Sequence, residues 1–153
     1  MKKVKCFLTM LLIALSIVAT TVPTFANSSD TMCSIDVTTA FTKKTQVRLK
    51  DSNSGCYLNI QTAPTTYSYV QAQGCVGGNT NSTRVNQTYV LGKTGIPLYV
   101  TCRVNVNYNI HNLIYENGYK YAALDFQTTQ PGRLVYVWSP DIASGGSLYT
   151  NAT

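Results

Sequence analysis

Apolar and polar residues alternate along much of the chain after residue 33, a pattern typical of β-strands with one buried face. Thr, Val, Tyr, Asn and Ser dominate this part, and no window places apolar residues at helical spacing. The pattern predicts strands at residues 34–40, 46–50, 56–60, 67–73, 87–91, 97–107, 113–116, 119–126 and 133–138. Many short strands separated by turn residues predict an all-β fold, an antiparallel β-sandwich or small barrel, as a single domain over residues 33–153.

Turn residues predict how some of these strands are connected. Asn117-Gly118 fits a type I′ turn, so residues 113–116 and 119–122 are expected to form a β-hairpin. Residues 51–55, Asp-Ser-Asn-Ser-Gly, are also expected to form a turn, because these side chains hydrogen-bond their own backbone.

The last predicted strand, residues 133–138, has large apolar side chains on one face and valines on the other. Apolar residues on both faces are typical of a central strand. The strand is expected to stop by Ser139, because Pro140 has no N–H to donate to a neighbouring strand.

The N-terminal segment has the three parts of a secretory signal peptide. Lysines at positions 2, 3 and 5 precede an apolar run over residues 7–18, and the small-residue site Thr-Phe-Ala follows at 24–26. The apolar run is too short to span a bilayer. The sequence therefore predicts a signal peptide at residues 1–26, a flexible leader at 27–32 and a secreted, extracellular product.

Four cysteines follow the predicted signal peptide: Cys33, Cys56, Cys75 and Cys102. An even number of cysteines in an exported domain predicts disulfide bonds, and four cysteines permit three pairings. Cys56 and Cys75 lie symmetrically about the turn at residues 64–66, which favours pairing Cys56 with Cys75 and Cys33 with Cys102. Strand parity opposes the first pair unless the strand contains a bulge. Each bridge is expected to stabilise the domain by about 2–4 kcal/mol.

The charge balance restricts the class of partner. The whole chain has 12 Lys and Arg against 6 Asp and Glu, and three of the lysines belong to the predicted signal peptide. The remaining cations do not cluster with stacking aromatic residues, as a nucleic-acid interface requires. We therefore expect no nucleic-acid partner, no transmembrane segment in the mature chain, and a cell-wall polymer, a membrane surface or a protein as the partner.

Tyrosine is the most suggestive residue type, and all 11 tyrosines follow the predicted signal peptide. Tyr67 and Tyr69 are expected to share one strand face, as are Tyr119 and Tyr121, because residues two apart in a strand point the same way. Flat, amphipathic rings can stack on sugars or form a protein-binding patch. These four tyrosines are the candidate binding residues; the alternative is that tyrosine simply suits sheet faces.

Catalytic motifs are weak. His111 is the only histidine, so any Ser-His or Cys-His mechanism must use it, and no nucleophile motif accompanies it. Asp125 and Asp141 are the best candidates for paired carboxylates, although nothing in the sequence brings them together. Residues 51–55 resemble the opening of a calcium loop but lack the third oxygen ligand before the glycine and a bidentate Glu at the required distance. The sequence predicts no catalytic residue, no metal site and no cofactor, and leaves a small hydrolase that uses His111 with Asp125 or Asp141 as an alternative.

The C-terminal segment Gly-Arg-Leu-Val-Tyr-Val-Trp-Ser-Pro-Asp, at residues 132–141, resembles the end of a group of small exported proteins of Gram-positive bacteria. The signal peptide and the chain length fit the same group. Many of these proteins are uncharacterised, and some are discussed alongside bacteriocin-like exported β proteins. The resemblance implies an exported β protein and adds a bacteriocin-like toxin to the alternatives.

These features together predict a secreted, non-enzymatic binding protein that acts at the cell surface or the cell wall. The toxin alternative predicts that culture supernatant inhibits the growth of neighbouring strains. The hydrolase alternative requires His111 to share one pocket with a carboxylate.

Overall fold

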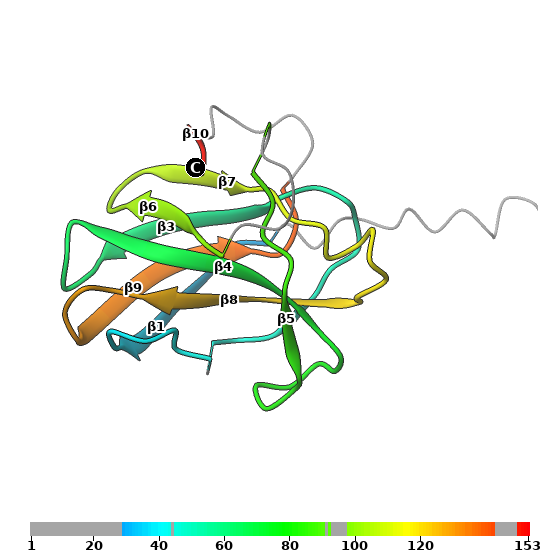
Figure 1. Ribbon diagram of the computed structural model, residues 1–153, viewed down its shortest axis with the longest axis horizontal. Coiled ribbons are helices and arrows are strands. Elements are labelled where there is room, and N and C mark those ends of the chain that lie inside the picture. Colours follow the sequence, from blue (N-terminus) through cyan, green and yellow to red (C-terminus); the bar gives the residue numbers. More distant parts are fainter. Residues whose placement is uncertain (1–28, 44, 91, 93–97, 143–149) are drawn as a thin grey trace, which may run out of the picture.

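A computed structural model describes residues 29–43, 45–90, 92, 98–142 and 150–153, and these residues form two β-sheets packed face to face (Figure 1). Sheet A has the strand order β1 (Thr31–Val37), β9 (Gly132–Ser139), β3 (Cys56–Thr62), β7 (Asn107–Ile110) and β10 (Thr150–Asn151). Sheet B has the order β2 (Arg48–Leu49), β8 (Tyr121–Gln127), β4 (Tyr67–Cys75) and β5 (Arg84–Asn86), and β6 (Val100–Arg103) also pairs with β4. The pairs between these strands are antiparallel except for the parallel pair β7–β10. The all-β prediction is confirmed as two packed sheets, and the barrel alternative is wrong.

The core lies between the sheets, because every second side chain of the long strands points inward. Leu58 and Ile60 of β3 and Val70 and Ala72 of β4 are fully buried there. The prediction of a central last strand is confirmed, since β9 lies between β1 and β3 and ends at Ser139. Its inward-facing residues are also buried in the core: Leu134, Tyr136 and Trp138.

The predicted single strand over 97–107 is wrong, because the chain changes sheets within it. Strand β6 ends at Arg103, and β7 begins at Asn107 in the opposite sheet. Asn105, between them, has a φ of 60°, a left-handed conformation that asparagine tolerates better than most residues. Its N–H donates to the Ile60 carbonyl at 2.7 Å, so the turn is held to β3.

The predicted hairpin around Asn117-Gly118 is also wrong. The N–H of Gly118 donates to the Tyr115 carbonyl, and the N–H of Tyr119 donates to the Ile114 carbonyl, both at 3.0 Å. These two bonds, with a φ of 79° at Gly118, form the Schellman motif that ends a helical turn. Both a type I′ turn and a Schellman motif need a residue with positive φ, and glycine suits both. The Asn-Gly sequence alone therefore does not distinguish a hairpin from the end of a helical turn.

The predicted disulfide bonds are contradicted, because all four cysteines in the described chain are free. Cys56 is in sheet A and points into the core. Cys75 is the last residue of β4 in sheet B, at a position whose side chain faces away from the core. Cys33 and Cys102 are also in different sheets, on β1 and β6. The β3 and β4 strands do not pair with each other, so the bridge across a hairpin that the spacing suggested does not exist.

The predicted signal peptide and residues 27–28 of the predicted leader lie outside the described residues. Strand β1 begins at Thr31, inside the predicted leader. Before it, the Arg48 guanidinium donates to the Ser29 carbonyl at 2.8 Å and lies 5.5 Å from the ring centre of Trp138. Within the described part of the chain, no helix has the length and hydrophobicity needed to cross a bilayer.

Candidate functional site

Four aromatic rings form a continuous row on the outer face of sheet B. Tyr67 and Tyr69 alternate along β4 with residues that point into the core, so both rings point outward. Their ring centres are 5.5 Å apart, Tyr69 is 4.6 Å from Tyr99, and Tyr99 is 6.3 Å from Phe41. We call these four residues the aromatic row. It joins three segments that are distant in the sequence.

The segment that carries Tyr99 is held in place by side-chain amides. Nitrogen atoms of Gln71 and Asn86 both donate to the Leu98 carbonyl. Beyond Tyr99, the N–H of Thr101 donates to the Thr153 carbonyl at 2.9 Å. Leu98 and Tyr99 are nevertheless 75% and 42% exposed, so this segment presents apolar and aromatic surface to solvent from an anchored backbone.

The geometry of the aromatic row favours an irregular contact surface over a flat platform. Successive rings are inclined to one another by 63°, 50° and 38°. Tilted and edge-to-face contacts of this kind stabilise aromatic pairs. A hydrogen bond with Tyr67 and the nearby Tyr67 phenol group raise the pKa of Tyr69 above its ordinary value.

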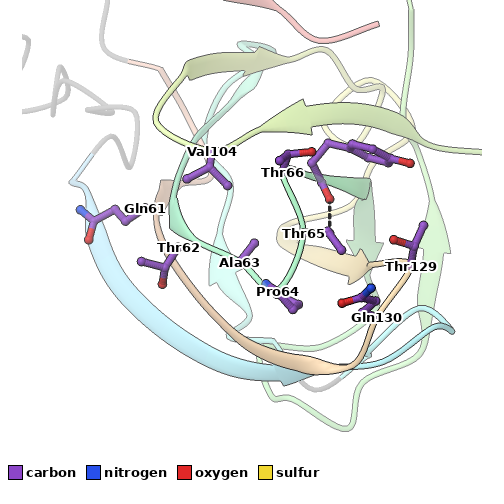
Figure 2. A pocket seen from close by; sticks show the side chains of 10 residues that line it. Gln61, Thr62, Ala63, Pro64, Thr65, Thr66, Val104, Thr129 and Gln130 are labelled. Atoms are coloured by element: carbon purple, nitrogen blue, oxygen red, sulfur yellow. Dashed lines mark hydrogen bonds between the residues drawn. The ribbon is translucent and has the colours of Figure 1, made fainter.

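An open groove adjoins the aromatic row at one end of the sandwich, where three turns meet (Figure 2). Residues 61–67, Val104, Thr129 and Gln130 line it, and its volume is about 660 Å³. Tyr67 belongs to both features, because it lines the groove and contacts Tyr69. The candidate site is therefore the aromatic row together with this groove, which we call the end groove.

Tyr119 and Tyr121, the other two predicted binding residues, lie near the opposite end of β4. Tyr121 is opposite Cys75, whereas Tyr69 is opposite Gln127 at the far end of the same strand pair. Their rings lie over glycines: an added Cβ at Gly74 would be 2.6 Å from the Tyr119 ring, and one at Gly78 would be 2.9 Å from the Tyr121 ring. The structure therefore brings Tyr67 and Tyr69 together but separates them from the second pair.

The residues of the hydrolase alternative occupy three different environments. His111 follows β7 in sheet A, and its Nε2 lies 3.0 Å from the Asn151 side-chain oxygen. Asp125 is fully buried in β8 of sheet B and pairs with Arg84. Asp141 is fully buried beyond β9 and pairs with Lys50 at 2.9 Å. Each carboxylate thus has its own cation, and His111 lies in the other sheet from Asp125. Among the described residues there is no cluster of three metal-ligating side chains.

Sequence reasoning missed two members of the aromatic row. Tyr99 has the same parity as Thr101 and Arg103, the polar face of a recognised strand pattern, so parity could have placed it on an outward face. Its position beside Tyr69 also requires the pairing of β4 with β6, which only the structure shows. Phe41 carried no such signal. It lies in the connection after β1, and the bridge between Thr42 and Phe126 places that connection against sheet B.

Residues 20–142 of the 153-residue chain match a family described as "Protein of unknown function (DUF2712)". No curated protein and no solved structure matches the chain.

Proposed function

Because the chain belongs to this family of unknown function, we propose a function from its own surface: it is an exported protein that binds a partner at the cell surface or cell wall and catalyses no reaction. Export follows from the signal-peptide pattern of residues 1–26. The partner contacts the aromatic row. Of the four tyrosines that the sequence offered as binding residues, the proposal keeps Tyr67 and Tyr69. It adds Tyr99 and Phe41 as further contact residues.

The observation that carries the proposal is the partial exposure of a preassembled aromatic cluster. Tyr99 is 42% exposed and the adjacent Leu98 is 75% exposed, although burial of such side chains is favourable. Aromatic residues are enriched at the centres of binding interfaces because they bury a large area with few rotatable bonds. The contacts among the rings reduce the entropy that ordering them on binding would cost.

The positions of the candidate catalytic residues favour binding over the hydrolase alternative. Asp125 and Asp141 are fully buried and each is paired with a cation. A carboxylate with no exposed surface cannot come within hydrogen-bond reach of a substrate, as a general acid or base must. We therefore expect that replacing His111 by alanine makes no difference when the wild type and the variant are assayed for hydrolysis of wall glycans and peptides.

A retention assay tests the proposal with a matched pair of variants. The mature chain, residues 27–153, is incubated with cell-wall, membrane and lipid-linked wall-precursor fractions, and the bound amount is measured. Tyr99→Ala is expected to lower the affinity for the retaining fraction roughly tenfold, as removal of an interface aromatic does. The control is Tyr115→Ala, because Tyr115 is 49% exposed but lies outside the aromatic row. Absence of retention on every fraction, or equal losses in both variants, contradicts the proposal.

A further inference from the structure

The end groove is formed by three turns, and irregular backbone positions shape it. Strand β3 shifts register between Ile60 and Thr62, so Gln61 is the extra residue of a β-bulge. A bulge redirects the side chain that it carries, and Gln61 lines the groove. On the other side, Asn105 adopts a left-handed conformation next to Val104, which also lines the groove.

The walls of the groove are packed against one another. Gly132, at the start of β9, is so close to Pro64 that an added Cβ would lie 2.9 Å from the Pro64 Cβ. The N–H of Val104 donates to the Thr66 carbonyl at 3.3 Å. The β3–β4 turn is therefore in contact with both neighbouring turns, and the groove is preformed.

The lining of the groove is polar but carries no formal charge. Its ten residues include two side-chain amides, from Gln61 and Gln130, and four threonine hydroxyl groups. Ala63, Pro64 and Val104 add apolar surface, and Tyr67 adds an aromatic ring. Figure 2 shows Gln130 and Thr129 on one side of the β3–β4 turn, and Gln61 and Thr62 on the other side. None of these ten residues is Asp, Glu, Lys, Arg or His.

This lining restricts the chemistry of a ligand. Amide and hydroxyl groups both donate and accept hydrogen bonds, as the hydroxyl groups of a sugar do. A charged ligand group would find no ion-pair partner among these ten residues. A fully apolar ligand would make no hydrogen bonds with the amides and hydroxyl groups. A sugar ring also has an apolar face, which fits the aromatic ring and the apolar floor.

From this geometry we infer that the end groove binds an uncharged oligosaccharide. The inference rests on the proposed function, since it names the ligand class of the same site. Tyr67 connects the two parts, because the sugar chain contacts it in the groove and extends toward Tyr69 and Tyr99. A volume of about 660 Å³ lies within the usual range for small-ligand sites.

Binding to oligosaccharides of matched length and different charge tests this inference. The probes are neutral hexamers of glucose and N-acetylglucosamine, a cationic glucosamine hexamer and an anionic galacturonate hexamer, titrated by calorimetry against the mature chain. A neutral hexamer is expected to bind most tightly. The Gln61→Ala/Gln130→Ala variant is expected to bind it about tenfold more weakly, because two hydrogen-bonding groups are lost. The control is Gln46→Ala, an exposed glutamine outside the groove.

The outcomes separate the inference from the proposed function. Tight binding of a neutral hexamer with a selective loss in the groove variant supports the inference. Preference for a charged probe, or a groove variant that binds like Gln46→Ala, overturns it. If the wall or membrane fraction still retains the protein in a Tyr99-dependent way, the proposed function stands without it. If the protein binds no hexamer and is also not retained by any cell-wall, membrane or wall-precursor fraction, both the inference and the proposed function are overturned.

Discussion

Two buried ion pairs, Lys50–Asp141 and Arg84–Asp125, have the same charges but differ in their hydrogen bonding. Asp141 accepts hydrogen bonds from the backbone N–H groups of Asp51 and Ser52, at 2.9 and 3.2 Å, in addition to the Lys50 ammonium group. Lys50 in turn donates to two backbone carbonyls. In the other pair, Arg84 donates to the Thr45 hydroxyl group and to the Thr45 and Thr80 carbonyls, but Oδ2 of Asp125 and Nε of Arg84 have no hydrogen-bond partner among the described residues.

The pKa values of the two carboxyl groups shift in opposite directions for this reason. Burial alone would raise the pKa of Asp141, but the Asp51 N–H and the Lys50 ammonium group outweigh it and lower the pKa. Burial raises the pKa of Asp125 to about 6, and Arg84 offsets only part of that effect. The comparison teaches that hydrogen-bond donors, more than the presence of a cation, decide whether a buried carboxylate is stabilised.

The difference also assigns structural roles to residues that the sequence offered as a catalytic pair. Asp141 joins the segment after β9 to the turn at 51–55 by binding its backbone N–H groups. That turn was predicted, but its carboxylate partner is distant in the sequence. Asp125 ties β8 to Arg84 of β5.

The largest expected effect is the removal of the fully bonded carboxylate. Asp141→Ala leaves the Lys50 ammonium group buried without its counter-charge, and is expected to lower the free energy of unfolding by about 3–5 kcal/mol. Equilibrium unfolding in urea measures the loss. The control is Asp36→Ala, which breaks the exposed pair with Arg133 and should cost less than about 1 kcal/mol. Equal losses in both variants would refute a special role for Asp141.

A pH series tests the opposite shifts. Because the folded pKa of Asp125 is raised to about 6, its contribution to stability is fully present below the ordinary value of 3.8 and is lost as the pH rises through 6. The expected loss between pH 4 and pH 7.5 is roughly 2 kcal/mol, because each tenfold difference in proton affinity between the folded and unfolded chains corresponds to about 1.4 kcal/mol and part of the effect lies below pH 4. Asp125→Asn should lack this dependence. Asp141 has a lowered pKa, so its contribution is present above 3.8 and is lost only at lower pH.

The pH series has a clear contrary outcome. Urea midpoints are compared at matched pH for the wild type and Asp125→Asn, so that other titrating groups cancel. A wild type that gains stability relative to Asp125→Asn between pH 4 and pH 7.5 would show that Arg84 lowers the pKa of Asp125 below its ordinary value.

Replacing both charges of the poorly bonded pair gives a smaller effect. Arg84→Met with Asp125→Leu removes two charges of which each has an unsatisfied atom. Apolar substitution of such a pair is often neutral or stabilising by about 1–4 kcal/mol, but here it also removes the donor to the Thr45 and Thr80 carbonyls, so a net change close to zero is expected. The same replacement at Lys50 and Asp141 should destabilise, because the N–H groups of the 51–55 turn lose their acceptor. Thermal unfolding of both double variants checks the comparison, and equal shifts contradict it.

The parts of the fold that the sequence predicted are those set by local alternation. The outward placement of Tyr67 and Tyr69 and the end of β9 at Ser139 both follow from side-chain parity and from Pro140. The change of sheet at Asn105 does not, because valine–polar alternation continues through it. The end groove was unpredictable for a related reason: it needs three turns that meet only in the folded chain.

The cysteines show the same limit, and they provide the smallest expected effect. Symmetric spacing about a turn suggests a bridge only if the two flanking strands pair, and β3 and β4 lie in different sheets. With four free thiols and two buried ion pairs, stability should not depend on sulfur chemistry. Adding a thiol reductant is expected to change the free energy of unfolding by less than about 0.5 kcal/mol, whereas each native bridge would contribute about 2–4 kcal/mol. Thiol titration of the denatured mature chain should find all four cysteines reduced. A large loss of stability with reductant would mean that the cysteines form bridges in solution and would contradict the four free thiols.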